Sequence, residues 1–270
     1  MSFSPVVPLS GYAGWSFLKR TMESQKAAYE QNPALKRDED YFRAKIGGIK
    51  TAEALVSDKR LLRVALGAFG LSDDVNNTYF IRKVLEDGTL KIGALANKLA
   101  DKQYAAFSVA FGFGDYSTPR TQLSDFPDMI LKKYRQQEFE VAVGASNSAM
   151  RLALFAEREL PALAGKALSE DGKWFTIMGS PPLRAVFESA FGLPSSFATL
   201  DLDRQLFFLK DKARAMFGGD SVSQFADTGQ KEKLLRNYLV RSDLASSELS
   251  NMTKGATALQ ILQQRQFGAL

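Results

Sequence analysis

The amino-acid sequence predicts an all-α protein that is multihelical and compact. Two stretches, 58–71 and 180–193, carry apolar residues at i, i+3, i+4, i+7 and i+8, which places them on one face of an α-helix. Each stretch also has a helix start signal and a closing glycine. No segment alternates between apolar and polar residues with the period of two that a half-buried strand requires. We therefore expect no sheet.

The stretch 58–71 shows the helical pattern most clearly. Its apolar stripe consists of Leu61, Val64, Ala65, Ala68 and Phe69. Asp58 can cap the start of this helix, and Gly70 can take the left-handed conformation that closes its end. The same spacing returns in Leu183, Val186, Phe187, Ala190 and Phe191. There Pro181 opens the helix and Gly192 closes it.

Two further segments end in Phe-Gly, which indicates internal duplication. Phe111-Gly112 ends a shorter segment with a similar apolar pattern, and Phe217-Gly218 ends a segment in which the pattern is weaker. We expect two structural repeats of helix pairs that end in Ala-Phe-Gly type caps, in halves of about 41–125 and 165–245. Their phenylalanines would form a buried seam where paired helices cross. A structural role is therefore predicted for Phe69, Gly70, Phe111, Gly112, Phe191, Gly192, Phe217 and Gly218.

The N-terminal region is expected to consist of an arm and a helix. Residues 1–14 are rich in Pro, Gly and Ser and are predicted to be flexible. A single multihelical domain would then span 15–270. Its first helix extends to about Gln31 and stops at Asn32-Pro33, because the residue before a proline disfavours the helical conformation. The side chains of this helix that we consider for partner contact are Trp15, Phe17 and Leu18.

The other helices follow from the same start and stop signals. Thr51 can cap the helix that follows it. Polar connections are expected at 36–40 and 115–125. The helices before the middle of the chain are predicted at about 41–46, 52–56, 72–87, 90–100 and 101–111. Those near the end are predicted at about 201–216, 230–240 and 257–266. The first of these three is expected to bury Leu202, Leu206, Leu209, Ala213 and Met216.

A long helical region, about 127–160, joins the two halves and is predicted to end at Pro161. It is either one long helix or two helices joined near Gly144, and the sequence leaves both open. The segment 165–179 has a mixed pattern. Its large apolar residues, expected to pack on the core, are Trp174, Phe175 and Ile177.

The composition excludes several classes of active site. The chain has no cysteine and no histidine. It therefore cannot form a disulfide, a thiol nucleophile, a Ser-His-Asp triad, a histidine-based zinc site or a haem–histidine bond. Carboxylates are the remaining acid–base groups, and pairs such as Asp73-Asp74 are typical of a solvated helix start. We expect no catalytic residue, no cofactor, no metal and no enzymatic activity.

Short catalytic motifs in the chain are incomplete. Ser16 and Lys19 have the Ser-x-x-Lys spacing of penicillin-recognising enzymes, but the companion motifs are missing. Gly112 and Gly114 are not followed by the third glycine of a dinucleotide-binding turn, and no strand precedes them. Chance explains the Ser16–Lys19 match better than catalysis does. A helix cap explains the glycines at 112 and 114 better than a dinucleotide-binding turn does.

The chain is mildly basic, with a net charge of +5 and a pI of about 9.2. Lys132, Lys133 and Arg135 cluster on one helix and could bind an acidic partner or a phosphate backbone. A solvated helix face is the usual alternative. Similar clusters occur at Lys210, Lys212 and Arg214 and at Lys231, Lys233, Arg236 and Arg241. No apolar run reaches the roughly 18 residues that cross a bilayer, and we expect no Sec signal peptide.

Several blocks of the chain, taken together, match the pattern of a known family. They are Pro8–Trp15, Phe17–Thr21, Tyr41–Ile46, Asp58–Leu71, Ile81–Leu85, Phe139–Val143, Asn147–Glu157 and Phe191–Leu193. In that order they resemble the bacterial family known as domain of unknown function 1217, found mainly in alphaproteobacteria. The resemblance covers nearly the whole chain and implies a multihelical fold. It also implies a genomic association, since members often lie among flagellar genes. The family offers no catalytic residues to transfer.

The resemblance favours a non-enzymatic, flagellum-associated protein that acts by binding other proteins. Axial flagellar proteins generally assemble through terminal helices, so residues 2–31 and 257–266 are the expected binding elements. The same ends could instead pack onto the domain. A cytoplasmic flagellar export chaperone or regulator is one alternative, and a nucleic-acid binder that uses the basic helices is another. The protein is expected in the cytoplasm, or in the flagellum after export by a signal-less route.

Overall fold

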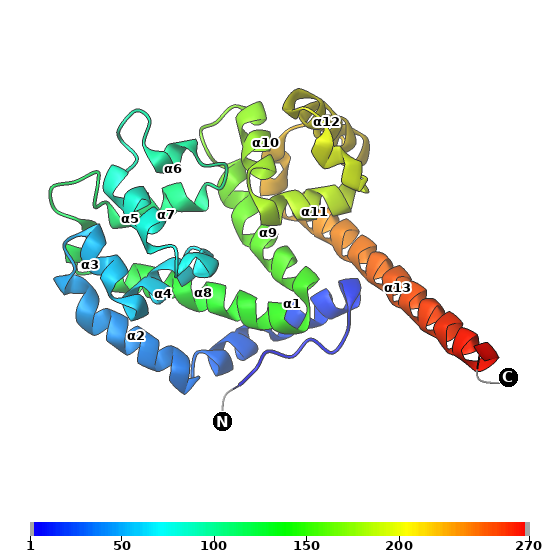
Figure 1. Ribbon diagram of the computed structural model, residues 1–270. Helices are drawn as coiled ribbons and strands as arrows, with labels where there is room; N and C mark the ends of the chain where they lie inside the picture. The colour runs from blue at the N-terminus through cyan, green and yellow to red at the C-terminus, as the bar shows by residue number, and fades with distance from the viewer. Residues whose placement is uncertain (1–2, 268–270) are drawn as a thin grey trace.

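The structure, a computed structural model, describes residues 3–267, with side chains through residue 247. Within 3–267 it contains thirteen α-helices and five short 3₁₀ helices, and no strand. The predicted all-α, multihelical and compact fold is therefore confirmed. The helices form two lobes, each around its own core of buried apolar side chains (Figure 1).

The first lobe contains α4 (Lys59–Gly67), the best predicted helix of the chain. The Asp58 carboxylate accepts hydrogen bonds of 3.0 Å from the backbone N–H groups of Arg60 and Leu61, so it caps α4 as predicted. The predicted apolar stripe is buried. The other helices of this lobe are α2 (Pro33–Lys45), α3 (Ala52–Ser57), α5 (Thr78–Asp87), α6 (Leu95–Lys98) and α7 (Gln103–Phe111).

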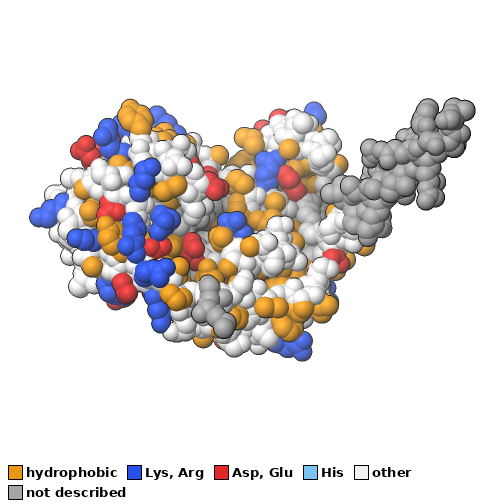
Figure 2. Space-filling view, turned by 60° about the horizontal axis from the view of Figure 1, so that its bottom comes forward, with side chains coloured by type: hydrophobic (Ala, Val, Ile, Leu, Met, Phe, Trp, Pro, Cys, Tyr) orange, Lys and Arg blue, Asp and Glu red, His pale blue; other side chains and the backbone are white. Residues whose placement is uncertain are grey.

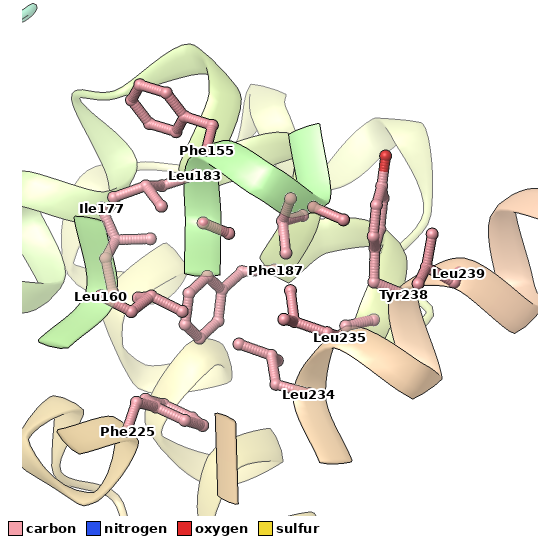
Figure 3. Close-up of a cluster of buried hydrophobic side chains, with 14 of the residues drawn as sticks. Phe155, Leu160, Ile177, Leu183, Phe187, Phe225, Leu234, Leu235, Tyr238 and Leu239 are labelled. Carbon is pink, nitrogen blue, oxygen red and sulfur yellow. The ribbon is translucent and has the colours of Figure 1, made fainter. Parts of the chain in front are cut away.

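The second lobe packs around Phe187 of α11 (Pro181–Phe191). Figure 3 shows the Phe187 ring among Leu160, Leu234 and Leu235, which come from two other helices. The whole predicted stripe of α11 is buried. The other helices of this lobe are α1 (Gly11–Tyr29), α9 (Ser148–Ala164), α10 (Glu170–Met178), α12 (Leu202–Phe217) and α13 (Thr228–Phe267).

The helix α8 (Phe126–Ser146) belongs to both lobes. Its first half contributes Ile130 and Tyr134 to the first core, and its second half contributes Phe139 and Val143 to the second. Figure 1 shows α8 running beneath both lobes. A single rigid element therefore sets the position of one lobe relative to the other.

The long helical region predicted between the two halves is two helices, α8 and α9, and they meet at Asn147. Asn147 has an extended backbone, and its side-chain oxygen accepts a 3.1 Å hydrogen bond from the N–H of Met150. The junction lies here and not at Gly144 because asparagine can satisfy a free amide at a helix start. Pro161 lies inside α9 and does not end it, since the Gly165 N–H closes another turn on the Pro161 carbonyl.

The helices that end in Phe-Gly close with a left-handed glycine, as predicted. The backbone φ is +73° at Gly70 and +64° at Gly192. The following residues, Leu71 and Leu193, donate their N–H groups to the carbonyl five residues earlier, at 3.0 and 2.9 Å. Gly112 and Gly218 also have positive φ, and the phenylalanines before the four glycines are buried: Phe69, Phe111, Phe191 and Phe217. The duplication of the two halves stays a prediction.

The start of the first lobe differs from the prediction at α2. The charged residues 36–40, predicted as a link, lie within α2. Lys36, Arg37 and Asp40 are exposed, whereas Asp38 and Glu39 are partly buried in ion pairs with arginines of α4 and α8. The same helix buries Leu35 and Phe42. The next helix, α3, agrees with its prediction, since the Thr51 hydroxyl accepts a 3.1 Å hydrogen bond from the N–H of Ala54.

Two later helices of the first lobe are shorter than predicted. The helix α5 does not start at residue 72, because Ser72–Asp74 form a separate 3₁₀ helix, η2. The helix expected at 90–100 is reduced to α6, because Gly93 has a φ of +87°, which is incompatible with an α-helix.

The second lobe also corrects three expectations. On α12, Leu202 is 59% exposed, whereas Leu209 and Ala213 are buried as predicted. On α10, Phe175 is 41% exposed. The two helices predicted near the end of the chain are one helix, α13, since no proline interrupts residues 228–267. The predicted binding element 257–266 falls within α13, and its side chains lie outside the described residues.

Residues 3–10 are extended and lie against α1. The amide of Gln25 bonds to the backbone N–H and carbonyl of Val6, at 2.7 and 3.0 Å. The amide of Asn32 bonds to both backbone groups of Phe3, at 2.7 and 3.0 Å. Because α1 also starts earlier than predicted, the extended arm is shorter than expected.

Candidate functional site

The partner-binding side chains predicted on the N-terminal helix lie mostly inside the protein. Trp15 and Leu18 are 1% and 0% exposed and belong to the second core. Phe17 is half-buried. Because α1 packs against α13, its apolar stripe is already covered. Trp15 and Leu18 are therefore core residues, which corrects the expectation that they contact a partner.

The basic residues predicted as a cluster on α8 do not form one basic face. Arg135 pairs with Glu39, with 2.8 Å between Nη1 and Oε2. The Nζ of Lys133 lies 5.5 Å from the centre of the Phe69 ring, whereas Lys132 borders a different hollow, together with Arg135. Adjacent helix residues point about 100° apart, which separates the two lysines. Figure 2 shows acidic side chains among the basic ones on the first lobe.

An apolar surface that the sequence analysis missed lies on α12. Leu202, Phe207 and Phe208 are 59%, 65% and 41% exposed. The two phenylalanine rings meet edge to face, with 5.7 Å between their centroids. We call Phe207 and Phe208 the α12 aromatic face; Leu202 lies about 140° around the helix from Phe207. Phe207 and Phe208 lie outside the apolar spacing of Leu206, Leu209, Ala213 and Met216, and this was the sequence signal for exposed rings.

Charged side chains of both signs border the α12 aromatic face. A hollow of about 340 Å³ beside Phe207 is bordered by Asp203, Asp211 and Arg214. Lys210 also borders it and pairs with Asp171 of α10 at 2.7 Å. The face therefore combines an apolar centre with a polar rim, which is the common composition of a protein–protein contact.

A cleft of about 490 Å³ lies between the two lobes. Its floor is α8, and its walls are the segments that follow α4 and precede α7 on one side, and α9 and the start of α11 on the other. Gly70 and Pro181, predicted only as helix ends, both line it. Side chains that line it include Asp101, Gln137, Glu140, Arg151, Leu152 and Phe155. Because these residues come from distant parts of the chain, no local motif indicated the cleft.

The polar groups of the cleft differ in how they are satisfied. Glu140 is 1% exposed and is held by Arg158, at 2.9 and 3.2 Å, and by the Gln136 amide, at 2.8 Å. Within the described part of the chain, Asp101 accepts only the backbone N–H of Gln103, at 2.9 Å. Burial raises the pKa of Asp101 above its ordinary value. Glu140 is thus a structural anion, whereas Asp101 is free to meet a ligand.

A serine–lysine contact in the second lobe resembles a nucleophile and base but acts as a clamp. The Nζ of Lys173 donates to the Ser223 hydroxyl at 2.6 Å, to Glu170 at 3.0 Å and to the Ala164 carbonyl at 2.9 Å. All three of its hydrogens are used, so it has no lone pair to accept the serine proton. The clamp joins α9 and α10 to the 3₁₀ helix η5 (Val222–Ala226).

The carboxylate of this clamp is strongly held in its ionised form. Burial opposes the ionisation of Glu170, but hydrogen bonds from Ser223, Lys173 and Ser221 outweigh it and lower its pKa to about 2. Among the described residues, no group of three or more acidic side chains is arranged to hold a metal ion. No helix within the described part of the chain is long and apolar enough to cross a membrane.

The fold and the cleft define an all-α, two-lobed protein whose lobes share one helix. Residues 68–232 match the family described as "Protein of unknown function (DUF1217)". Because this match covers more than half of the sequence, the chain belongs to that family, and the resemblance found in the sequence is confirmed.

The fold is also similar to that of a solved protein. The crystal structure of protein AGR_C_984 from Agrobacterium tumefaciens superimposes with a TM-score of 0.72 and 24% sequence identity. The alignment covers 90% of this chain and 99% of the Agrobacterium chain. At this identity the likeness shows the fold alone. No curated protein matches the chain.

Proposed function

We propose that this protein is a non-enzymatic, flagellum-associated component that acts by binding other proteins. The observation that carries the proposal is the α12 aromatic face, where two adjacent phenylalanines are open to solvent. Burying one such side chain against a partner contributes roughly 1.5–3 kcal/mol. Exposed apolar groups that gather in one place are typical of interaction sites in soluble proteins.

The mixed charges around the α12 aromatic face support a protein partner in preference to a nucleic acid. A phosphate backbone requires a continuous basic surface. Here Asp203 and Asp211 lie beside Arg214, and Lys210 is paired with Asp171. The association with the flagellum rests on the gene neighbourhood that the family resemblance implies. The saturated serine–lysine clamp and the lack of histidine and cysteine support a role other than catalysis.

Photo-cross-linking in swimming cells tests the proposal. Benzoylphenylalanine replaces Phe207 or Phe208 in the full chain, and exposed Leu123 of the first lobe serves as the control position. The cells are then fractionated into cytosol, culture supernatant and purified hook–basal bodies. We expect the protein in the basal body or supernatant, cross-linked to a flagellar component from positions 207 and 208 and not from 123.

Two results would contradict the proposal. Equal cross-linking from all three positions would remove the α12 aromatic face as a binding surface. Recovery in the cytosol alone would replace a structural role with that of an export chaperone or regulator.

A further inference from the structure

Buried side-chain amides hold extended backbone elsewhere in this chain. Gln25, 8% exposed, accepts the N–H of Val6 and donates to its carbonyl. Asn32, 7% exposed, bonds in the same way to Phe3. A primary amide carries a donor and an acceptor side by side, so it matches the two backbone groups of one extended residue. At two places in this protein, a buried side-chain amide therefore binds both backbone groups of one extended residue.

Gln137 is a further buried amide, and it lacks such a partner. It is 6% exposed and lies in the floor of the interlobe cleft, next to Gly70. Its amide forms no hydrogen bond with any residue in the described part of the chain, and its polar atoms keep access to the cleft. Nearly all buried polar side chains in folded proteins are hydrogen-bonded. An amide that opens into a cavity is therefore available to bond to water or to a ligand that displaces the water.

The cleft has a partly apolar wall. A smaller hollow of about 90 Å³ adjoins it, and the two share Asp101, Gln103 and Phe155. Leu152 and Pro181 add apolar surface to the larger hollow. The open amide matches the two backbone groups of one extended residue, and this favours a peptide as the occupant.

Asp101 stands where the two hollows meet and favours a positive charge. It forms no ion pair within the described residues, and the charge of Asp74 nearby adds to the negative potential. The cation of the larger hollow, Arg151, acts on Glu138 of α8, so its charge is partly compensated. In the smaller hollow, Lys102 donates to the carbonyls of Asn97 and Leu99, and Lys166 lies in the same lining as Glu159. A lysine or arginine side chain of a ligand would pair with the Asp101 carboxylate.

We propose that the interlobe cleft binds an extended peptide segment of a partner protein, with one residue's backbone on the Gln137 amide and a lysine or arginine side chain at Asp101. The proposal rests on the proposed protein-binding function and deepens it by naming the chemistry of a partner. It concerns a different surface from the α12 aromatic face, so the two can fail separately.

The test uses a phage-displayed library of random dodecapeptides, panned against the full chain. Selected peptides are synthesised with a fluorophore, and their affinity is measured by fluorescence polarisation. We expect the selected peptides to be enriched in lysine or arginine. Gln137→Ala and Asp101→Asn should each weaken binding by about tenfold or more, because the first removes two hydrogen bonds to the peptide backbone and the second removes an ion pair. The matched controls, exposed Gln31→Ala and Asp125→Asn, should bind as the original chain does.

Leu152→Trp fills the cleft from its wall and should abolish binding. This variant keeps the proposal testable if Gln137→Ala misfolds. Circular dichroism of each variant checks the fold. Binding that none of the three cleft variants weakens would overturn the proposal. So would competition by N-acetyl-lysine amide at the concentration of the peptide, since the cleft would then be a small-molecule site. A Phe207→Ser/Phe208→Ser variant should retain peptide binding, and its failure would place the peptides on α12.

Discussion

At the scale of the residue, phenylalanine fills both cores. The chain has twenty phenylalanines and two tryptophans. In the second core, Phe187 makes edge-to-face contacts at 5.3–5.4 Å with Trp174, Phe191 and Phe225. Each ring buries a large apolar area, and edge-to-face pairs add to the stability that burial provides. Helical spacing predicted the burial of Phe191, because this residue belongs to the apolar stripe of its helix.

Phe191→Ala should lower the free energy of unfolding by about 3–5 kcal/mol, because it leaves a cavity beside Phe187 and Phe217. Urea denaturation followed by circular dichroism measures the change. Phe207→Ala is the matched control, since the same substitution on a 65% exposed side chain should change stability by less than about 0.5 kcal/mol. Equal effects of the two substitutions would contradict this account of the core.

At the scale of the element, capping residues set the helix boundaries. Thr51, Asp58 and Asn147 each accept a backbone N–H at the start of a helix. The first two were predicted, because each precedes an apolar stripe. The third was missed, because apolar residues continue across it and conceal the junction of α8 and α9. A cap can therefore divide a pattern that periodicity alone treats as continuous.

Asn147→Ala should lower the free energy of unfolding by about 1 kcal/mol, because the first turn of α9 loses its side-chain acceptor. Thermal and urea denaturation measure the loss. Ser180→Ala is the control, because Ser180 occupies the same position before α11 but forms no side-chain cap bond. A loss at Ser180 as large as that at Asn147 would show that the cap bond is not the cause.

At the scale of the whole molecule, α8 couples the two cores, and Tyr29 of α1 packs against both. The helix α8 gives Ile130 to the first core and Val143 to the second, within one helix. Unfolding either core would remove the support of α8 for the other. The two lobes are therefore expected to unfold as one cooperative unit.

The positions of the tryptophans make this expectation measurable. Trp15 and Trp174 both lie in the second core, so tryptophan fluorescence reports on the second lobe alone. Circular dichroism reports on all helices. We expect the two signals to give the same midpoint in urea, and Phe107→Ala in the first core to shift both midpoints equally. Separate midpoints would show that the lobes unfold independently in spite of α8.

The sequence by itself determined the helical class, the family and most of the buried residues. These follow from short-range regularities: apolar spacing, capping residues such as Asp58 and closing glycines such as Gly70 act within a few positions of the chain. It also indicated Trp15 and Leu18 as possible partner contacts and left open that the N-terminal helix packs onto the domain. Only the packing of α1 on α13 decides that these two side chains face inward.

Tertiary structure alone decided the surfaces that can act on other molecules. Which phenylalanine of α12 faces outward depends on where α10 and α11 cover that helix. The cleft exists because Gln137, Asp101 and Pro181, distant in the chain, meet between two lobes that α8 holds in place. Such contacts are set by the relative placement of whole helices, on which local spacing carries no information.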